Sequence, residues 1–213
     1  MEFRHLIEIV GEEPIFETGL LLAGAVNKTD VRRQLSRWTK AGRIWQLRRG
    51  LYTLAPPFQK VKPHPFVVAN RMVHGSYVSL QSALAYYGLI PEYVPVVTSV
   101  TVSRPGHWDT LLGKYDFHHV KTNMFRGYRL TVLTAGQEAF VATPEKALLD
   151  LVYLQVGGDS EEYLAGLRLQ NLESLDLTKL KQEAGLSCSA KLQRAYAIIS
   201  NLVTAEKGDY RRL

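Results

Sequence analysis

Several features that would narrow the class of this protein are scarce or missing from its sequence. The chain has one cysteine, Cys188, which excludes an internal disulfide and leads us to expect a reducing cytoplasm. No run of about 18 apolar residues occurs, so we expect no membrane-spanning helix. The apolar stretch 19–26 lacks the basic flank and the cleavage site of a signal peptide. These absences predict a globular protein that works away from a membrane.

Motifs of metal binding and catalysis are missing as well. The six histidines show no spacing typical of metal ligands, and no Cys-x-x-Cys pair, Gly-rich phosphate loop or nucleophile elbow is present. His118 and His119 are neighbours on a predicted strand, so they point to opposite faces and cannot easily share a metal. We therefore expect no catalytic residue, no metal and no cofactor.

One enzymatic alternative stays open. The acids Asp109, Asp116 and Glu138 could form a cluster that binds a divalent metal, which would make the protein a DNA nuclease. None of the three belongs to a Glu-x-Lys or Asp-x-Lys pair, which disfavours this alternative.

The positive charge of the chain is concentrated in one short segment. The formal net charge is +6, and the segment from Lys28 to Gly50 contains eight basic residues with Asp30 as its only acid. The rest of the chain is therefore close to neutral. Charge confined in this way indicates that the segment has a polyanionic partner.

The residues around this segment predict three helices. Apolar spacing favours a helix over 3–10, a second over 16–23 that ends at Gly24, and a third that runs to Ala41. Asn27 is the expected N-cap of the third helix, because its side chain can accept from the first free backbone N–H groups.

The third helix has one apolar face and one basic face. Val31, Leu35 and Trp38 lie within about 60° of one another and form the expected buried stripe. The opposite arc is formed by Thr29, Arg32, Arg33, Ser36, Arg37 and Lys40. No acid stands at four-residue spacing on this arc, so its like charges repel unless a polyanion neutralises them. DNA phosphate would do so, and a helix fits the major groove.

A hairpin with a basic tip follows the helix. Two β-prone runs, within 43–54, flank Arg48-Arg49-Gly50, and Gly50 can adopt the positive φ of a short turn. The order of elements predicts a winged helix-turn-helix over residues 1–55 that binds double-stranded DNA. The bases would be contacted by Thr29, Arg33 and Arg37, and the phosphates by Lys28, Arg32, Lys40, Arg43, Arg48 and Arg49. A module of this shape that binds only protein is the other open alternative.

The rest of the chain predicts a second region. Four prolines within ten residues mark a connector over 56–65, and residues 66–213 follow as an α+β region that ends in helices. We expect helices at 66–73 and 78–89, the latter capped by Ser79, then strands at 96–103, 114–121, 128–134 and 138–142. Thr143-Pro144-Glu145 begins a helix to about 156, and helices at 161–169, 178–184 and 189–204 complete the chain. The expected fold class is α+β.

Four blocks of this sequence resemble a known family. They are the hairpin region 42–52, Tyr77-Val78-Ser79-Leu80-Gln81-Ser82-Ala83-Leu84-Ala85-Tyr86-Tyr87-Gly88-Leu89-Ile90, Phe117-His118-His119-Val120-Lys121, and Ala142-Thr143-Pro144-Glu145-Lys146-Ala147-Leu148-Leu149-Asp150-Leu151. The last block is the most specific. Together they are similar to the abortive-infection antitoxins of the AbiEi type, also described as transcriptional regulators of viral defence systems.

The resemblance implies a protein with two functions. The winged helix would bind inverted repeats in its own promoter and repress a two-gene operon. The second region would counter a toxin of the nucleotidyltransferase class, without a stable complex between toxin and antitoxin.

Overall fold

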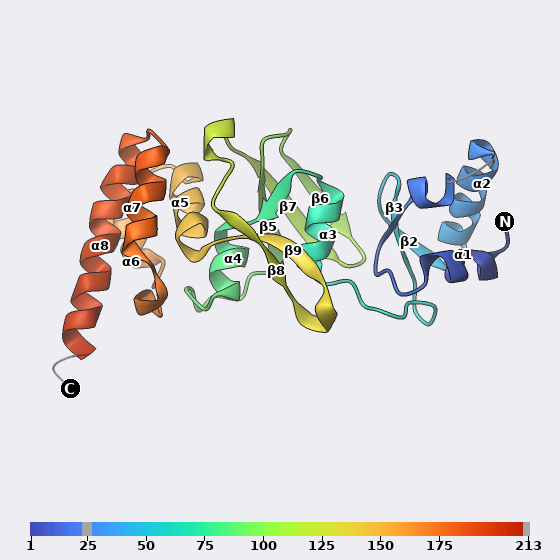
Figure 1. The fold of residues 1–213 in the computed structure, drawn as a ribbon, viewed down its shortest axis with the longest axis horizontal. Helices are drawn as coiled ribbons and strands as arrows, with labels where there is room; N and C mark the ends of the chain where they lie inside the picture. The colour runs from blue at the N-terminus through green and yellow to red at the C-terminus, as the bar shows by residue number, and fades with distance from the viewer. Residues whose placement is uncertain (23–26, 211–213) are drawn as a thin grey trace.

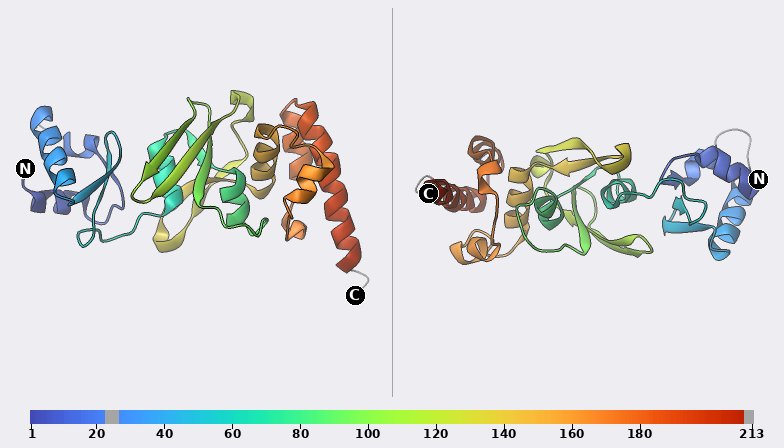
Figure 2. Two further views of the ribbon diagram at one scale, coloured as in Figure 1. Left: turned by 180° about the vertical axis from the view of Figure 1, so that it is seen from behind. Right: turned by 90° about the horizontal axis from the view of Figure 1, so that it is seen from below.

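The computed structural model describes residues 1–22 and 27–210 of the 213-residue chain. It is a mixed α+β fold with two separate sheets, which confirms the α+β class predicted from the sequence. Figure 1 shows the chain extended along one axis, with the N-terminal elements at one end and helix α8 (Ala190–Tyr210) at the other. The larger sheet lies between them, also when seen from behind and from below (Figure 2). Among the described residues, no helix combines the length and the apolar character needed to cross a bilayer.

The N-terminal elements form a small module with its own sheet. In chain order they are α1 (Phe3–Val10), β1 (Phe16–Glu17), the 3-10 helix η1 (Thr18–Leu22), α2 (Lys28–Lys40), β2 (Ile44–Arg48) and β3 (Leu51–Leu54). The strands are antiparallel in the order β1-β3-β2. Leu6 of α1, Leu35 of α2 and Ile44 of β2 meet in a core between the helices and the sheet. The helices predicted at 3–10 and from Asn27 to Ala41 are confirmed.

The helix predicted over 16–23 is wrong. Phe16 and Glu17 form a strand instead, and η1 follows up to Leu22, while the expected end at Gly24 lies outside the described residues. Phe16 pairs with Tyr52 of β3, and the centroids of their rings are 5.7 Å apart. A strand partner distant in the sequence therefore overrides the local apolar pattern.

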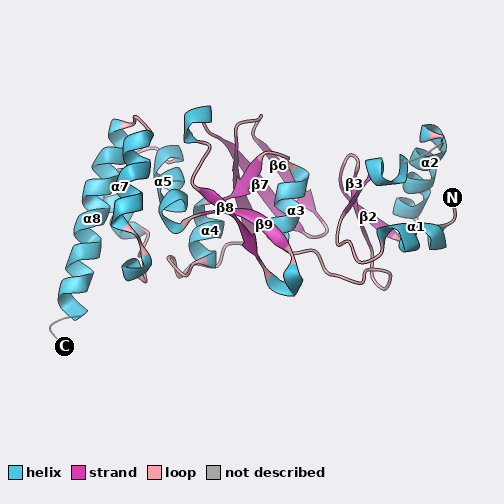
Figure 3. Cartoon of the chain, viewed as in Figure 1, coloured by secondary structure: helices cyan, strands magenta, loops and turns pink. Residues whose placement is uncertain are grey.

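The hairpin of β2 and β3 is buried on both faces. Tyr52 and Leu54 belong to the core of the N-terminal module, whereas Leu47 and Leu51 belong to the core of the larger region. Figure 3 shows the two strands between the N-terminal helices and the larger sheet. The turn contains Gly50 with a φ of +85°, which confirms the positive φ predicted there. The hairpin thus joins the two cores.

The proline-rich connector, residues 56–65, is tied to the elements on either side of it. Near its start, Gln59 donates from Nε2 to the hydroxyl of Thr53 at 2.9 Å. Near its end, the backbone N–H of His64 donates to the side-chain carbonyl of Gln137 at 2.9 Å. These hydrogen bonds fix the path of the connector along both sheets.

The larger region is built on a six-stranded sheet in the order β6-β7-β5-β4-β9-β8. Its strands are β4 (Ser76–Val78), β5 (Val96–Thr101), β6 (Gly106–Thr110), β7 (Gly113–His119), β8 (Tyr128–Val132) and β9 (Glu138–Ala142). The pairs β4–β9 and β5–β7 are parallel, and the other neighbours are antiparallel. The four predicted strands are confirmed, mostly with shorter bounds, whereas the sequence does not predict β4 and β6.

Helices pack against this sheet and extend beyond it. They are α3 (Pro65–Met72), α4 (Leu80–Tyr86), α5 (Pro144–Leu154), α6 (Glu161–Gly166), α7 (Leu177–Leu186) and α8, with short 3-10 turns η2 (Thr122–Met124), η3 (Thr134–Gly136) and η4 (Leu172–Ser174). Helix α3 contacts β4 and β9, and α4 contacts β5 and α5. Helix α7 packs between α5 and α8, which carries the core of the larger region into the C-terminal helices. All six helices predicted here are confirmed in position, with bounds that shift by a few residues.

A buried carboxylate, that of Asp150 in α5, connects this helix to the sheet. Asp150 accepts from the hydroxyl of Tyr77 at 2.9 Å and from that of Ser79 at 2.8 Å. It also pairs with Lys146, one helical turn earlier, and both charged side chains are almost completely buried. Burial raises the pKa of the Asp150 carboxyl, and the Lys146 ammonium and the two hydroxyls oppose that rise. Ser79 occupies the N-cap position of α4 as predicted, but its hydroxyl binds Asp150 and forms no cap hydrogen bond.

The surroundings of Lys146 are shaped to hold it. Gly127 has a φ of +71°, and a Cβ added there would lie 3.0–3.1 Å from the side-chain carbons of Lys146. The ammonium lies 5.9 Å from the ring centroid of Tyr77, and that ring stacks on Tyr128 at 4.5 Å. A charge removed from water is stable only with such partners, so the pair depends on the tertiary structure around it.

Substitution of Lys146 tests this pair. In K146M the carboxylate of Asp150 stays buried without its cation, so we expect the free energy of unfolding to fall by about 3–5 kcal/mol. The double variant K146M/D150L removes both charges and should recover part of this loss. Urea-induced unfolding followed by circular dichroism measures both values. A loss in K146M of about 1 kcal/mol or less, the size found for exposed ion pairs, would contradict the assignment.

Candidate nucleic-acid interface

Helix α2 begins at the cap that the sequence predicts. The side chain of Asn27 accepts from the backbone N–H groups of Thr29 at 2.9 Å and of Asp30 at 3.4 Å. These bonds satisfy two of the donors that are free at the start of a helix. The N-cap prediction is therefore confirmed.

The predicted apolar stripe fixes the rotation of α2. Val31, Leu35 and Trp38 are buried, and the ring of Trp38 lies 5.4 Å from that of Phe3 in α1. With this stripe inward, the opposite arc must face solvent. Figure 1 shows α2 at the N-terminal end of the molecule, far from α8.

Nine of the ten residues predicted to bind DNA are exposed. They are Lys28, Thr29, Arg32, Arg33, Ser36, Arg37, Lys40, Arg43 and Arg49. Seven of them come from α2 and two from the segment that continues into the hairpin. The structure therefore displays the basic residues on the outside of one helix, where they are free to contact a large partner.

Arg48 is the exception, because it is half-buried. Its Nε atom has no contact with solvent and no hydrogen-bond partner among the described residues. Arg49, next to it in the turn, is exposed. The sequence places both arginines at the tip of the hairpin, but the packing of β2 against the larger region leaves Arg49 as the more accessible of the two.

Two contacts made by arginines of the basic segment were not predicted from the sequence. Arg33 forms an ion pair with Asp30 at 3.4 Å, three residues earlier on the same helix. Both side chains are exposed, so this pair contributes little to stability and leaves Arg33 able to exchange partners. The guanidinium of Arg43 lies 5.1 Å from the ring centroid of Phe3, which orients it by a cation–π contact.

The three acids of the nuclease alternative are not brought together. Asp109 pairs with Lys114 at 3.7 Å, and Asp116 contacts the ring of His107. Glu138 lies on β9, which is separated from β7 by β5 and β4. Among the side chains that the structure describes, those of residues 1–22 and 27–205, no group of three or more His, Cys, Asp or Glu is arranged to hold a metal ion.

The two adjacent histidines differ in their surroundings, as strand alternation predicts. His118 is half-buried, whereas His119 is exposed and places Nδ1 3.1 Å from the backbone carbonyl of Ser103. They lie on opposite faces of β7 and share no ligand position.

The comparison of the sequence with known proteins gives no match, neither to a family model nor to a curated protein.

The cap of α2 can be tested by substitution. In N27A the two backbone donors lose their acceptor, so we expect the free energy of unfolding to fall by about 1 kcal/mol. N27S retains a side-chain oxygen and should stay close to the unmodified protein. Urea unfolding of the three proteins gives the comparison. Equal destabilisation of N27A and N27S would mean that the side-chain oxygen does not stabilise the helix.

Proposed function

We propose that this chain binds double-stranded DNA through its N-terminal module, which acts as a winged helix-turn-helix. The observation that carries the proposal is the exposed arc of α2. Five basic side chains of this helix face solvent, as do Arg43 and Arg49 of the hairpin segment, and Asp30 is the only acid in the segment. Like charges so placed repel one another, and DNA phosphate relieves that repulsion while releasing counterions.

In this proposal α2 is the recognition helix. Thr29, Arg33 and Arg37 would face base edges in the major groove, since arginine pairs with guanine through two hydrogen bonds. The phosphates would be bound by Lys28, Arg32, Lys40, Arg43 and Arg49, with a smaller share for Arg48 because of its buried Nε.

The hairpin supports the assignment as the wing. Its two buried faces hold β2 and β3 in a fixed position beside α2, and β2 contacts that helix. A rigid wing keeps Arg49 at a constant place relative to the helix. Such preorganisation reduces the entropy lost when the protein binds DNA.

The salt dependence of binding separates a DNA-binding module from one that binds only protein. We expect R32A and R49A each to reduce the slope of log K against log salt by about one unit, because each removes one phosphate contact. K181A, a change at an exposed lysine of α7, is the matched control and should leave the slope unchanged. Fluorescence anisotropy with the DNA upstream of the gene measures the slopes. Weak binding that is indifferent to salt would exclude DNA as the partner.

We further propose that the protein is a cytoplasmic repressor and antitoxin of the AbiEi type. The support is the resemblance of the four sequence blocks. In the most specific block, Thr143 caps α5, and the pair Lys146–Asp150 lies buried where α5 packs on the sheet. Residues of that block therefore have structural roles in this fold. The operator would consist of inverted repeats in the promoter, and the target would be a nucleotidyltransferase toxin encoded beside this gene.

Co-expression tests the antitoxin role separately from repression. Cells that express the neighbouring nucleotidyltransferase should stop growing, and expression of this chain from an unrelated promoter should restore growth. The double variant R37A/R49A should lose repression of a promoter fusion yet still restore growth, because the two functions use different regions. If the intact chain fails to restore growth, the antitoxin role is wrong while DNA binding is unaffected.

A further inference from the structure

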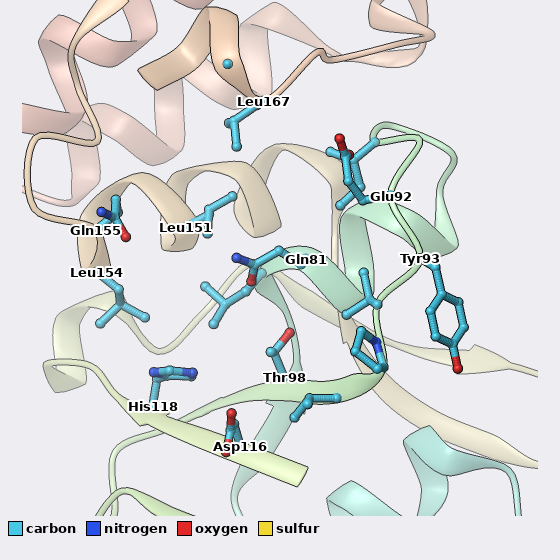
Figure 4. A pocket seen from close by; sticks show the side chains of 16 residues that line it. Gln81, Glu92, Tyr93, Thr98, Asp116, His118, Leu151, Leu154, Gln155 and Leu167 are labelled. Carbon is cyan, nitrogen blue, oxygen red and sulfur yellow. The ribbon is translucent and has the colours of Figure 1, made fainter. Parts of the chain in front are cut away.

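A cavity of about 640 Å³ lies between strands β5 and β7 and helices α4 and α5 (Figure 4). Its volume falls within the roughly 300–1,000 Å³ that small-molecule sites occupy. Leu80, Ile90, Leu151 and Leu154 supply apolar walls. Neither the basic arc of α2 nor the hairpin contributes to this cavity, so it is independent of the proposed DNA interface.

Three polar side chains face the cavity with unused hydrogen-bonding capacity. Asp116 and His118 stand two residues apart on β7, so they point to the same face of the sheet, and Gln81 of α4 lies above them (Figure 4). Within the described part of the chain, Gln81 and His118 form no side-chain hydrogen bond. Asp116 is contacted through Oδ1 by His107, which leaves Oδ2 free. Half-buried polar groups that converge on an apolar space indicate a site for a ligand with matching groups.

The wall at Leu80 is held in a strained conformation. Leu80 is buried and has a φ of +57°, which is unfavourable for a residue with a branched apolar side chain. The Thr98 hydroxyl donates to the carbonyl of Ser79 at 2.7 Å and accepts from the N–H of Ser82 at 3.1 Å, so the backbone on either side of Leu80 is held by one side chain. Strain maintained in this way is found where a surface is preformed for binding.

The charges around the cavity decide which ligands it accepts. Asp116 and Glu92 line it, and none of its described lining residues is a lysine or an arginine. Glu92 is paired with Arg168, whose guanidinium holds the pKa of the Glu92 carboxyl below its usual range. A phosphate group would therefore meet the carboxylate of Asp116 with no lysine or arginine of the lining to pair with it.

We propose that this cavity binds an uncharged nucleoside, or a similar flat heteroaromatic molecule, that carries an exocyclic amino group. The ring would lie between the leucine walls, and its amino group would donate to the free oxygen of Asp116. The amide of Gln81, which both donates and accepts, would pair with the adjacent ring edge. The charge of Asp116 would weaken the binding of phosphorylated forms.

Cytidine and uridine form a matched pair of probes, because they have the same shape and differ in whether the ring carries an amino group or a carbonyl. Isothermal titration of the full chain should give an affinity for cytidine at least roughly tenfold above that for uridine, since a carbonyl opposite Asp116 leaves the carboxylate unpaired. Cytidine monophosphate should also bind at least roughly tenfold more weakly than cytidine. Adenosine and guanosine extend the test to other amino-bearing rings.

Two variants locate the site. D116N should reduce the affinity for cytidine roughly tenfold, whereas D109N, at an exposed acid on the neighbouring strand β6, should leave it unchanged. Equal affinities for cytidine and uridine in the unmodified protein would overturn the proposal, whether or not D116N folds. It is also overturned if none of the three amino-bearing nucleosides binds, or if a folded D116N binds cytidine as the unmodified protein does.

Discussion

The carboxyl group of Asp150 lies where helix α5 meets strand β4, and much of the larger region depends on how its charge is satisfied. Lys146 and two hydroxyls from the β4 segment surround it, so the helix can take only the rotation that places all of these groups together. The same rotation turns Leu151 and Leu154 toward the cavity. One buried ion pair thus fixes the packing of α5 on the sheet and, through it, one wall of the candidate ligand site.

The hairpin of β2 and β3 lies between the N-terminal module and the larger region and contributes to the cores of both. Leu47 and Leu51 on one face enter the larger core, while Tyr52 and Leu54 on the other face enter the N-terminal core. Strands that are apolar on both faces must be covered on both, which explains why the module is docked against the larger region. The position of the hairpin turn in the proposed DNA interface is therefore set by the larger region as well as by α2.

The two candidate sites are joined by a short series of packed elements. Asp116 of β7 faces the cavity and contacts His107 of the neighbouring edge strand β6. Strand β6 in turn contacts β2, the first strand of the hairpin. The cavity and the proposed wing therefore share a continuous set of strands, although their chemistry is opposite: an acidic, partly apolar space in one case and an exposed basic surface in the other.

The sequence by itself determined those features whose signals lie within one turn of a helix or hairpin: the cap at Asn27, the stripe that rotates α2, the turn at Gly50 and the start of α5. Only the tertiary structure decided features that depend on distant partners. Phe16 is in a strand because Tyr52 pairs with it. The Ser79 hydroxyl forms no cap bond to α4 because it donates to Asp150, 71 residues away. The burial of Arg48 and the convergence of Gln81 with Asp116 follow from packing between elements, for which local patterns carry no signal.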